Sequence, residues 1–302
     1  MDAMIMYFGG IEAGGTKFVC AIGDENGKIY ARERVATEEP DVTIPKVIQF
    51  FRNFKVESLG IGSFGPVDLN KESKTYGRIT STPKLAWANY PLVQTMEEAL
   101  HVPVGFSTDV NGAALGELYR GAATGLDGCL YITVGTGIGA GLVSKHQLLQ
   151  GLSHPEMGHV LLRRHPEDKF EGICPYHQDC LEGLASGPAL EARWGKPASE
   201  LKNDQKVWKI EAEYLAQALM QYILIVSPKR IIMGGGVMKQ EQLFPMIRAR
   251  LKELLAGYLD FPELKERMDD YVVPPALGDN AGITGALILA RQALEREHVS
   301  RP

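Results

Sequence analysis

The sequence predicts an α/β protein with two domains and a ligand-binding cleft between them. Its length of 302 residues is about twice that of an average domain. Apolar stretches with the period of strands alternate with stretches that have the period of helices. Each half reads as strand, glycine turn, strand, strand and then alternating helices and strands, although the sequence itself does not repeat. Such alternation is typical of α/β domains, and ligands often bind where two domains meet.

The first half opens with three antiparallel strands. Residues 5–11 and 17–23 have strand character and flank a glycine turn. Asn26-Gly27 is a strong hairpin signal, so the segment after it is predicted as the third strand. The elements that follow are predicted, in order, as helix 42–53, strand 58–64, helix 92–100, strand 102–108 and helix 111–121.

The second half starts again with two strands around a glycine turn. These strands are residues 129–134 and 140–144, and Lys145-His146 begins a further hairpin turn. A long helix over residues 206–226 ends before Ser227-Pro228. The remaining predicted elements are strand 230–233, helix 240–256, strand 271–273 and helix 280–297.

Composition excludes several classes of protein. Hydrophobic residues make up 45% and charged residues 23%, as in ordinary soluble domains. A net charge of -5 argues against a nucleic-acid-binding surface. The first ten residues lack the charged region of a signal peptide, and no run of about 18 apolar residues predicts a membrane span. Four cysteines, two of them in a metal-like spacing, fit a reducing cytoplasm better than a disulfide framework.

Residues 154–183 carry a predicted metal site. Cys174, His177 and Cys180 follow a C-x2-H-x2-C spacing, and His159 can supply a fourth ligand. Two thiolates and two imidazoles form a closed tetrahedral shell, which suits structural zinc better than catalytic zinc. His154 and His165 lie near this stretch but off the ligand spacing, and Glu156 and Glu182 flank the metal loop.

Two glycine-rich turns are candidates for binding phosphate. The stretch from Gly9 to Lys17 nearly matches a P-loop, but it ends in Gly-Thr-Lys and leads into a strand instead of a helix. The stretch from Gly135 to Gly141 matches a dinucleotide fingerprint literally, yet a strand follows it too. Each turn can offer backbone N–H groups to phosphate oxygens, or it can be a plain hairpin turn.

Two further motifs lie where strands end. Gly234-Gly235-Gly236-Val237 allows close approach of a nucleotide base or ribose, and the alternative is a turn that leads into a helix. Thr108-Asp109-Val110-Asn111 ends one strand and opens a helix. Asp109 is then either a helix cap or a carboxylate that accepts the proton of a hydroxyl as its oxygen attacks a γ-phosphate.

Together these motifs resemble the ROK family (repressor, open reading frame, kinase), and the chain looks closest to its zinc-containing bacterial fructokinase branch. The resemblance implies a two-domain, actin-like ATPase fold of the sugar kinase and ribonuclease H-like type. We expect one domain over residues 1–118 plus about 288–302, and the other over residues 119–287. The motifs that carry the resemblance are GIEAGGTK (10–17), GSFGPVDL (62–69), TDVNGAALGE (108–117), TVGTGIGAG (133–141), HPEMGH (154–159), CPYHQDCLEG (174–183), GGGV (234–237) and GDNAGITGA (278–286).

By position, the resemblance implies a role for each matching residue. Asp109 is the catalytic base, and Glu12 stands near Mg²⁺, through water, where many relatives have Asp. His159, Cys174, His177 and Cys180 are the zinc ligands. The substrate-binding set is Gly65, Pro66, Val67, Thr108, Glu156, His159 and Glu182. The nucleotide-binding set is Gly14, Gly15, Thr16, Lys17, Thr133, Gly135, Thr136, Gly137, Pro188, Gly235, Gly236, Val237 and Met238.

The resulting expectation is a cytoplasmic kinase that uses ATP and Mg²⁺ to convert D-fructose to D-fructose 6-phosphate. Its partners are then a hexose and ATP, with neither nucleic acid nor membrane, and the resemblance implies a homodimer. Mannose, glucose or an N-acylated hexosamine are alternative substrates. A transcriptional repressor of the same family would need a helix-turn-helix before the first glycine motif, which begins at Gly9. A non-catalytic sugar-binding or zinc scaffold protein is the remaining alternative.

Overall fold

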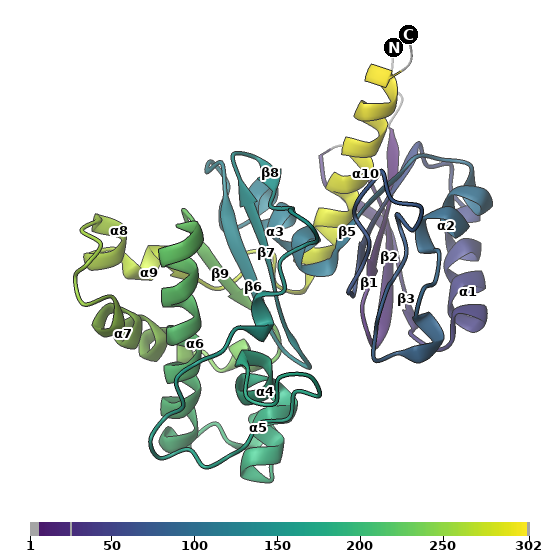
Figure 1. Cartoon of the computed structure of the whole chain (residues 1–302). Coiled ribbons are helices and arrows are strands. Elements are labelled where there is room, and N and C mark those ends of the chain that lie inside the picture. Colours follow the sequence, from purple (N-terminus) through teal and green to yellow (C-terminus); the bar gives the residue numbers. More distant parts are fainter. Residues whose placement is uncertain (1–5, 25, 301–302) are drawn as a thin grey trace. The chain divides into compact units, whose positions relative to one another are not determined.

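The computed structural model describes residues 6–24 and 26–300, which form two compact α/β units (Figure 1). Unit 1 contains the chain up to Thr124, Leu148–His154 and the chain from Asp279 on. Unit 2 contains Gly125–Gln147 and Pro155–Gly278. These divisions differ from the predicted ones, because unit 1 also takes residues 119–124, 148–154 and 279–287. The chain therefore passes between the units more than once.

Unit 1 is built on a five-stranded sheet of order β3-β2-β1-β4-β5. β1 (Tyr7–Ala13), β2 (Lys17–Asp24) and β3 (Ile29–Ala36) are antiparallel, as predicted, and Ile5 lies outside the described residues. β4 (Ser58–Ser63) and β5 (Val104–Thr108) continue the sheet parallel to β1. Because these three strands are parallel, their carboxyl ends lie along one edge, where α/β proteins usually bind ligands.

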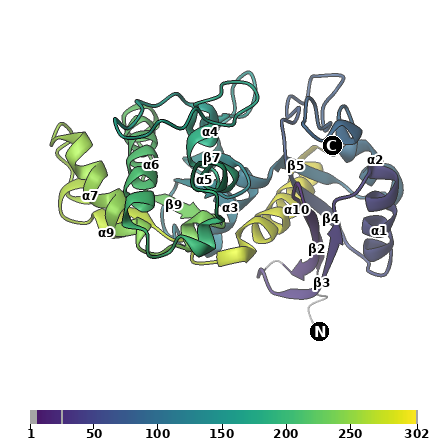
Figure 2. The same cartoon turned by 90° about the horizontal axis from the view of Figure 1, so that it is seen from below.

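Helices cover both faces of this sheet (Figure 2). Phe18, Cys20 and Ile22 belong to the apolar cluster that includes residues of α1 (Pro40–Arg52) and α2 (Leu92–Leu100). Val19 and Ala21, which alternate with them along β2, pack with Ile283 and Ala286 of α10 (Ala281–Ser300). The period of two along the strand thus divides the core into two layers. α3 (Asp109–Arg120) lies beside α10.

Glycines let α10 approach its neighbours at backbone distance. A Cβ atom on Gly60 in β4 would lie 1.8 Å from the carbonyl oxygen of Ala286. One on Gly105 in β5 would lie 2.3 Å from that of Leu289, and one on Gly285 would lie 1.7 Å from that of Gly112 in α3. No side chain fits at these distances, so glycine is required at all three positions.

Unit 2 has its own five-stranded sheet, of order β10-β9-β6-β7-β8. β6 (Cys129–Val134), β7 (Ile138–Ser144) and β9 (Ile231–Gly234) match the predicted strands within a few residues. Lys145 and His146 both have positive φ between β7 and β8 (Gln147–Leu148), which confirms the predicted hairpin turn. The last strand, β10 (Val272–Val273), starts one residue later than predicted, because Tyr271 ends a short helix.

Helices α6 (Gln205–Val226) and α7 (Leu243–Leu255) were predicted in unit 2, α7 with wider bounds. The structure adds short helices that the sequence analysis did not predict: α4 (Leu181–Ala185), α5 (Gly187–Trp194), α8 (Pro262–Lys265) and α9 (Met268–Tyr271). Four residues hold too little periodicity to distinguish a helix such as α8 from a turn. Within the described residues, no helix has both the length and the apolar character needed to cross a lipid bilayer.

The contact between α10 and α3 yields a stability prediction. We expect Gly285→Ala to lower the free energy of unfolding by about 3 kcal/mol or more, because the new methyl group would overlap the Gly112 carbonyl. Gly112→Ala is the matched control: its Cβ would make only ordinary contact, 3.5 Å from the Gly282 carbonyl oxygen. It should change stability by no more than about 1 kcal/mol. Urea unfolding measures both, and equal effects of the two substitutions would contradict this account.

Candidate functional site

Asp109 lies at the carboxyl end of β5, in the first turn of α3. The cap of this helix is Thr108, whose Oγ1 accepts a hydrogen bond from the Asn111 N–H at 3.1 Å. The alternative that Asp109 is the cap is therefore wrong. Asp109 is half-buried, and its Oδ1 accepts from the N–H of Val110 at 2.8 Å. A carboxylate at a helix N-terminus is favoured in its ionised form, as a general base requires.

Thr108 is buried, with only 4% of its surface exposed, and its hydroxyl oxygen is engaged in the cap. The cap sets where α3 begins and so where the Asp109 side chain starts. The structure thus assigns Thr108 a role in shaping the local backbone, and its contact with a sugar stays a prediction.

Glu12 is the second carboxylate of unit 1 near this point. Burial and, to a lesser extent, the nearby charge of Asp109 raise its pKa to about 7, although Arg32 and Lys17 oppose the shift. Its side chain packs tightly on the start of α10, since a Cβ atom on Gly282 would lie 2.6 Å from Glu12 Cδ. Two neighbouring carboxylates with oxygen-only donors suit a hard cation such as Mg²⁺, which would relieve their repulsion.

The first glycine turn joins β1 to β2 and is a tight hairpin turn. The Gly14 N–H donates to the Lys17 carbonyl at 3.0 Å, and the Gly14 carbonyl accepts from Thr37 Oγ1 at 2.8 Å. Gly15 is half-buried, and Thr16 and Lys17 are exposed. A strand follows the turn, so the predicted departure from a P-loop is confirmed, and phosphate binding by this turn stays a prediction.

The second and third glycine turns come together in unit 2. Gly135, Thr136 and Gly137 follow Thr133 at the end of β6, and the Gly187 N–H at the start of α5 donates to the Gly135 carbonyl at 2.7 Å. A Cβ atom on Gly135 would lie 3.8 Å from the backbone nitrogen of Gly236. Pro188 follows Gly187 in the first turn of α5. Three segments far apart in sequence thus present backbone groups to one place, as a phosphate or nucleotide site requires.

The third glycine turn, at residues 234–238, also limits which of its groups can contact a nucleotide. Gly235 has a φ of +93°, and a Cβ atom there would lie 2.4 Å from the carbonyl oxygen of Val134. Gly236 has open space instead, because a Cβ atom would meet nothing within 4 Å. The side chains of Val237 and Met238 are buried in the core of unit 2. A contact of these last two with a nucleotide would therefore use their backbone.

The predicted sugar loop follows β4. A cis peptide bond joins Gly65 to Pro66, whose carbonyl accepts from the N–H of Thr80 at 2.8 Å. The Val67 N–H donates to Nε2 of His154 at 3.2 Å. His154 was set aside in the sequence because it lies off the metal-ligand spacing, although it begins the HPEMGH motif.

Glu156 and Glu182 both belong to unit 2. Burial, followed by the charge of Glu182, raises the pKa of Glu156. Glu182 accepts a hydrogen bond from the N–H of Ile138 at 2.9 Å through Oε2, and a Cβ atom on Gly137 would lie 2.8 Å from the same oxygen. Glu182 therefore links the metal loop to the second glycine turn, a role that the sequence did not indicate.

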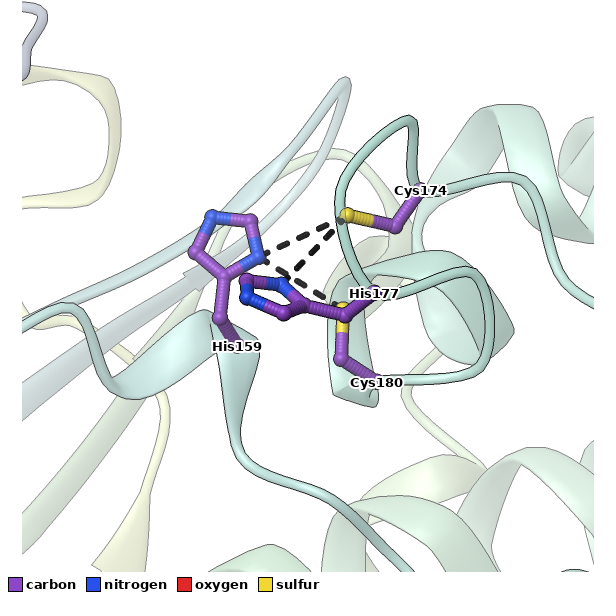
Figure 3. Close-up of side chains that lie close together, drawn as sticks. All are labelled: His159, Cys174, His177 and Cys180. Atoms are coloured by element: carbon purple, nitrogen blue, oxygen red, sulfur yellow. Dashed lines mark hydrogen bonds between the residues drawn. The ribbon is translucent and has the colours of Figure 1, made fainter.

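The four predicted zinc ligands form one cluster (Figure 3). Nδ1 of His159 lies 3.7 Å from Sγ of Cys174 and 3.5 Å from Sγ of Cys180, and Nδ1 of His177 lies 3.9 Å from Sγ of Cys174. Ligands at zinc distances of about 2.1 and 2.3 Å in a tetrahedron would lie roughly 3.6 Å apart. The donor set and its spacing therefore fit a tetrahedral zinc ion.

Local backbone geometry turns these ligands toward each other. Cys174 and Gln178 exchange two backbone hydrogen bonds, at 2.9 and 3.2 Å, so the chain folds back and brings His177 over Cys174. The Leu181 N–H donates to Val160 at 2.9 Å, which joins Cys180 to the segment that carries His159. Burial raises the pKa of the Cys180 thiol to about 11 in the metal-free protein, so a metal must displace its proton.

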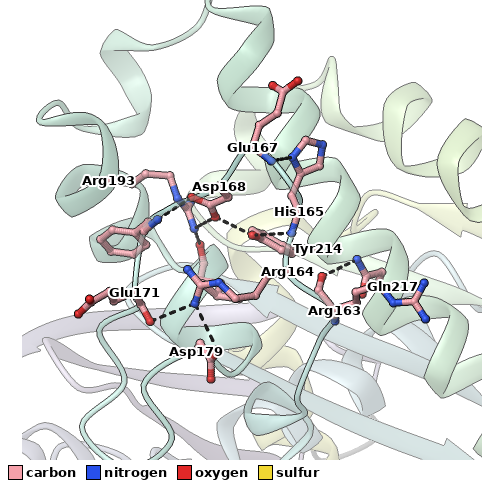
Figure 4. Close-up of polar contacts among 12 residues, drawn as sticks. Arg163, Arg164, His165, Glu167, Asp168, Glu171, Asp179, Arg193, Tyr214 and Gln217 are labelled. Atoms are coloured by element: carbon pink, nitrogen blue, oxygen red, sulfur yellow. Dashed lines mark hydrogen bonds and ion pairs between the residues drawn. The ribbon is translucent and has the colours of Figure 1, made fainter.

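A buried ion pair between Asp168 and Arg193 holds the metal loop, residues 159–180, at a second point away from the four predicted zinc ligands (Figure 4). Oδ2 of Asp168 lies 3.1 Å from Nη2 of Arg193, and their side chains are only 3% and 4% exposed, respectively. The same Oδ2 accepts a hydrogen bond from the Tyr214 hydroxyl at 2.6 Å. Arg193 donates to the Leu184 carbonyl at the end of α4 at 2.7 Å and stacks over Phe170. The pair therefore ties the loop to α4, α5 and α6. No spacing or motif in the sequence indicated it.

The comparisons with known proteins agree with this geometry. The ROK family model matches residues 8–293. A Bacillus subtilis (strain 168) protein provisionally named a fructokinase is 60% identical over 97% of this chain and 98% of its own length. A fructokinase of Pediococcus pentosaceus is 45% identical over 96% of this chain and 99% of its own.

Solved structures show the same fold. A ROK hexokinase from Thermus thermophilus superposes with a TM-score of 0.78 and 27% identity, covering 96% of this chain and all of its own. A Streptomyces griseus glucokinase of the same family was solved in complex with glucose and AMPPNP. It superposes with a TM-score of 0.71 and 27% sequence identity, covering 96% of this chain and 100% of its own. The expected two-domain, actin-like α/β fold is confirmed.

The metal cluster predicts that the purified protein contains one zinc ion per chain. Cys180→Ser should abolish zinc binding and lower the melting temperature by at least about 5 °C, because the ion links segments that are far apart in sequence. Cys20→Ala is the control, a buried strand cysteine outside the cluster, and it should keep the zinc. Metal analysis by mass spectrometry and thermal unfolding measure these effects. Wild-type protein without zinc would contradict the assignment.

Glu12 predicts a distinct pH dependence of stability without magnesium. Its pKa is about 7 in the folded chain against 4.5 for the ordinary group, so the unfolded state releases its proton first as pH rises. The free energy of unfolding should then fall by about 3 kcal/mol between pH 4.5 and 8 on this account. Glu12→Gln should remove that fall, whereas Glu33→Gln, on exposed strand β3, should keep it. Urea unfolding in magnesium-free buffer decides, and identical pH profiles for Glu12→Gln and wild type would disprove the shift.

Proposed function

Because the chain belongs to the ROK family, we propose that it is an ATP-dependent fructokinase that converts D-fructose to D-fructose 6-phosphate. Full-length identity of 45% and 60% to proteins named as fructokinases supports the substrate. The observation that carries the chemistry is the position of Asp109, at the carboxyl end of β5 and at the N-terminus of α3. Asp41, in the first turn of α1, is exposed, whereas Asp109 is half-buried.

Asp109 acts as the general base. Its carboxylate accepts the proton of the fructose 6-hydroxyl while that oxygen attacks the γ-phosphorus of ATP. A bond forms between the fructose 6-oxygen and the γ-phosphorus, the bond from the γ-phosphorus to the β–γ bridging oxygen breaks, and ADP leaves with the electron pair. Thr108 holds the start of α3, so the base keeps its place as the proton moves.

Backbone donors stabilise the phosphates. The turns of Gly14 to Lys17 and of Thr133 and Gly135 to Gly137 offer N–H groups and hydroxyls to the phosphate oxygens, apart from the Gly14 and Gly135 N–H groups, which donate within their own turns. Pro188 and Gly235 to Met238 line the adenosine side, through their backbone. Mg²⁺, when bound, neutralises charge on the transferring phosphoryl group, and Glu12 and Asp109 are the carboxylates that would hold it, in part through water.

The residues that the family resemblance assigns to the hexose are Gly65, Pro66, Val67, Thr108, Glu156, His159 and Glu182. A zinc ion held by the four protein side chains would have a structural role, because no coordination position would be left open. His159 would hold the ion through Nδ1, the nitrogen that lies next to both cysteine sulfurs, and its Nε2 would be left for the sugar.

We place this kinase in the cytoplasm as a homodimer. Each of the four cysteines is a free thiol in the structure, as a reducing compartment favours. The dimer rests on the resemblance to the family alone, and light scattering of the purified protein tests it.

The catalytic assignment predicts the behaviour of Asp109→Asn. Loss of the base should lower kcat by about 10²–10⁴-fold and leave the KM for fructose within about threefold. Asp41→Asn is the matched control, an exposed aspartate in the first turn of α1, and it should keep full activity. A coupled assay of ADP formation measures both.

The same assay across a panel of hexoses tests the substrate. Fructose should give the highest kcat/KM against mannose, glucose and N-acetylated hexosamines. Near-normal turnover by Asp109→Asn would remove Asp109 as the base, and a higher kcat/KM for another hexose would replace fructose.

A further inference from the structure

His154 sits where the chain leaves one unit and returns to the other. Residues 148–154, which we call the strap, belong to unit 1, although β7 before them and Pro155 after them belong to unit 2. The strap contacts unit 1 beyond the predicted sugar loop as well, since Gln150 Nε2 donates to the Leu69 carbonyl at 3.1 Å. Glu156, a proposed sugar contact, follows His154 by two residues.

The His154 ring contacts the sugar loop directly. Its Nε2 accepts the Val67 N–H at 3.2 Å, and a Cβ atom on Gly65 would lie 3.5 and 3.6 Å from Cε1 and Nε2. His154 is 7% exposed and Val67 is 3% exposed, so water cannot easily replace this bond. A ring nitrogen that accepts a hydrogen bond carries no proton, so His154 is neutral in this arrangement.

The other backbone groups of the loop are held from within unit 1. Phe64 donates its N–H to the Ala13 carbonyl at 2.7 Å, and the Pro66 carbonyl accepts from Thr80, through the N–H at 2.8 Å and through Oγ1 at 3.0 Å. Val67 also forms a bridge with Ile79. The bond to His154 ties the loop to the strap, and Glu156 follows two residues later in the chain.

We infer that His154 is a positioning residue for hexose binding, which fixes the Gly65–Val67 loop through the Val67 N–H. This inference rests on the proposed function, because the loop is assigned to the sugar on that basis. Asp109, the start of α3 and the glycine turns are held by other groups. Its loss should therefore weaken sugar binding more than it slows phosphoryl transfer.

Substitutions can separate the acceptor from the ring. In His154→Gln the amide oxygen stands as many bonds from Cα as Nε2 does, so it can accept the Val67 N–H. His154→Asn is too short to do so, and His154→Phe keeps the ring shape without an acceptor. We expect the Asn and Phe variants to raise the KM for fructose about tenfold, with kcat and the KM for ATP within about threefold. The Gln variant should restore the KM for fructose to within about threefold of wild type.

Gln150→Ala is the control on the same strap. It removes the exposed contact with Leu69 and leaves the loop untouched, so its KM for fructose should stay within about twofold of wild type. All variants should retain zinc. A kcat loss above a hundredfold in His154→Gln would overturn the positioning role in favour of a direct catalytic one, and unchanged KM values in the Asn and Phe variants would overturn it outright.

Amide hydrogen exchange at Val67 tests the contact without any sugar. The amide should be protected in wild type and in His154→Gln and should exchange at least about tenfold faster in the Asn and Phe variants. Equal protection in all four proteins would disprove the hydrogen bond. Failure of the wild-type chain to phosphorylate fructose would instead rule out the proposed function, and the positioning role with it. The hydrogen-exchange rates would then still show whether the bond between Val67 and His154 forms.

Discussion

Backbone-level contact between α10 and its neighbours fixes the carboxylate pair of unit 1. Gly60 and Gly105 let the helix lie directly on β4 and β5, and Gly285 lets it meet α3 at the Gly112 carbonyl. The start of the same helix presses on Glu12 through Gly282. Glycines at these contact points let the helix lie against the sheet and bury Glu12, and this burial, followed by the charge of Asp109, raises the pKa of Glu12.

Unit 2 uses a different device, since its loop regions carry the functional groups. One part of the metal loop carries the cluster of two cysteines and two histidines, and the other part is held by the buried pair of Asp168 and Arg193. Arg193 also holds the end of α4, whose first turn carries Glu182, and Glu182 in turn binds the second glycine turn. The short helix α4 thus connects the cluster of His159, Cys174, His177 and Cys180 with the second glycine turn.

Much of the site was predictable because glycine turns and metal spacings are local features. The zinc set and the strands around each glycine turn needed only residues that are close in sequence. The sequence did not reveal contacts between residues far apart in the chain, and it did not decide between two neighbouring residues that could fill the same role. Asp109 and Thr108 are both good caps, and only the structure shows that Thr108 takes that role. Asp168 and Arg193 stand 25 positions apart by number, and nothing in sequence pairs them. The sequence placed His154 off the metal-ligand spacing and gave no sign of a partner, so its bond to Val67 was missed.

The order of the segments along the chain has a consequence for how the protein folds. The face of the first sheet that carries Val19 and Ala21 is covered by α10, which is synthesised only after the whole of unit 2. On the ribosome, unit 2 can complete its core while that apolar face of unit 1 still lacks its cover. When α10 then packs on the first sheet, it brings together residues more than 200 positions apart in sequence, such as Gly60 and Ala286. Contacts of this separation form slowly. The nascent chain therefore has a period in which one apolar face of its first sheet is not yet covered by its own helix.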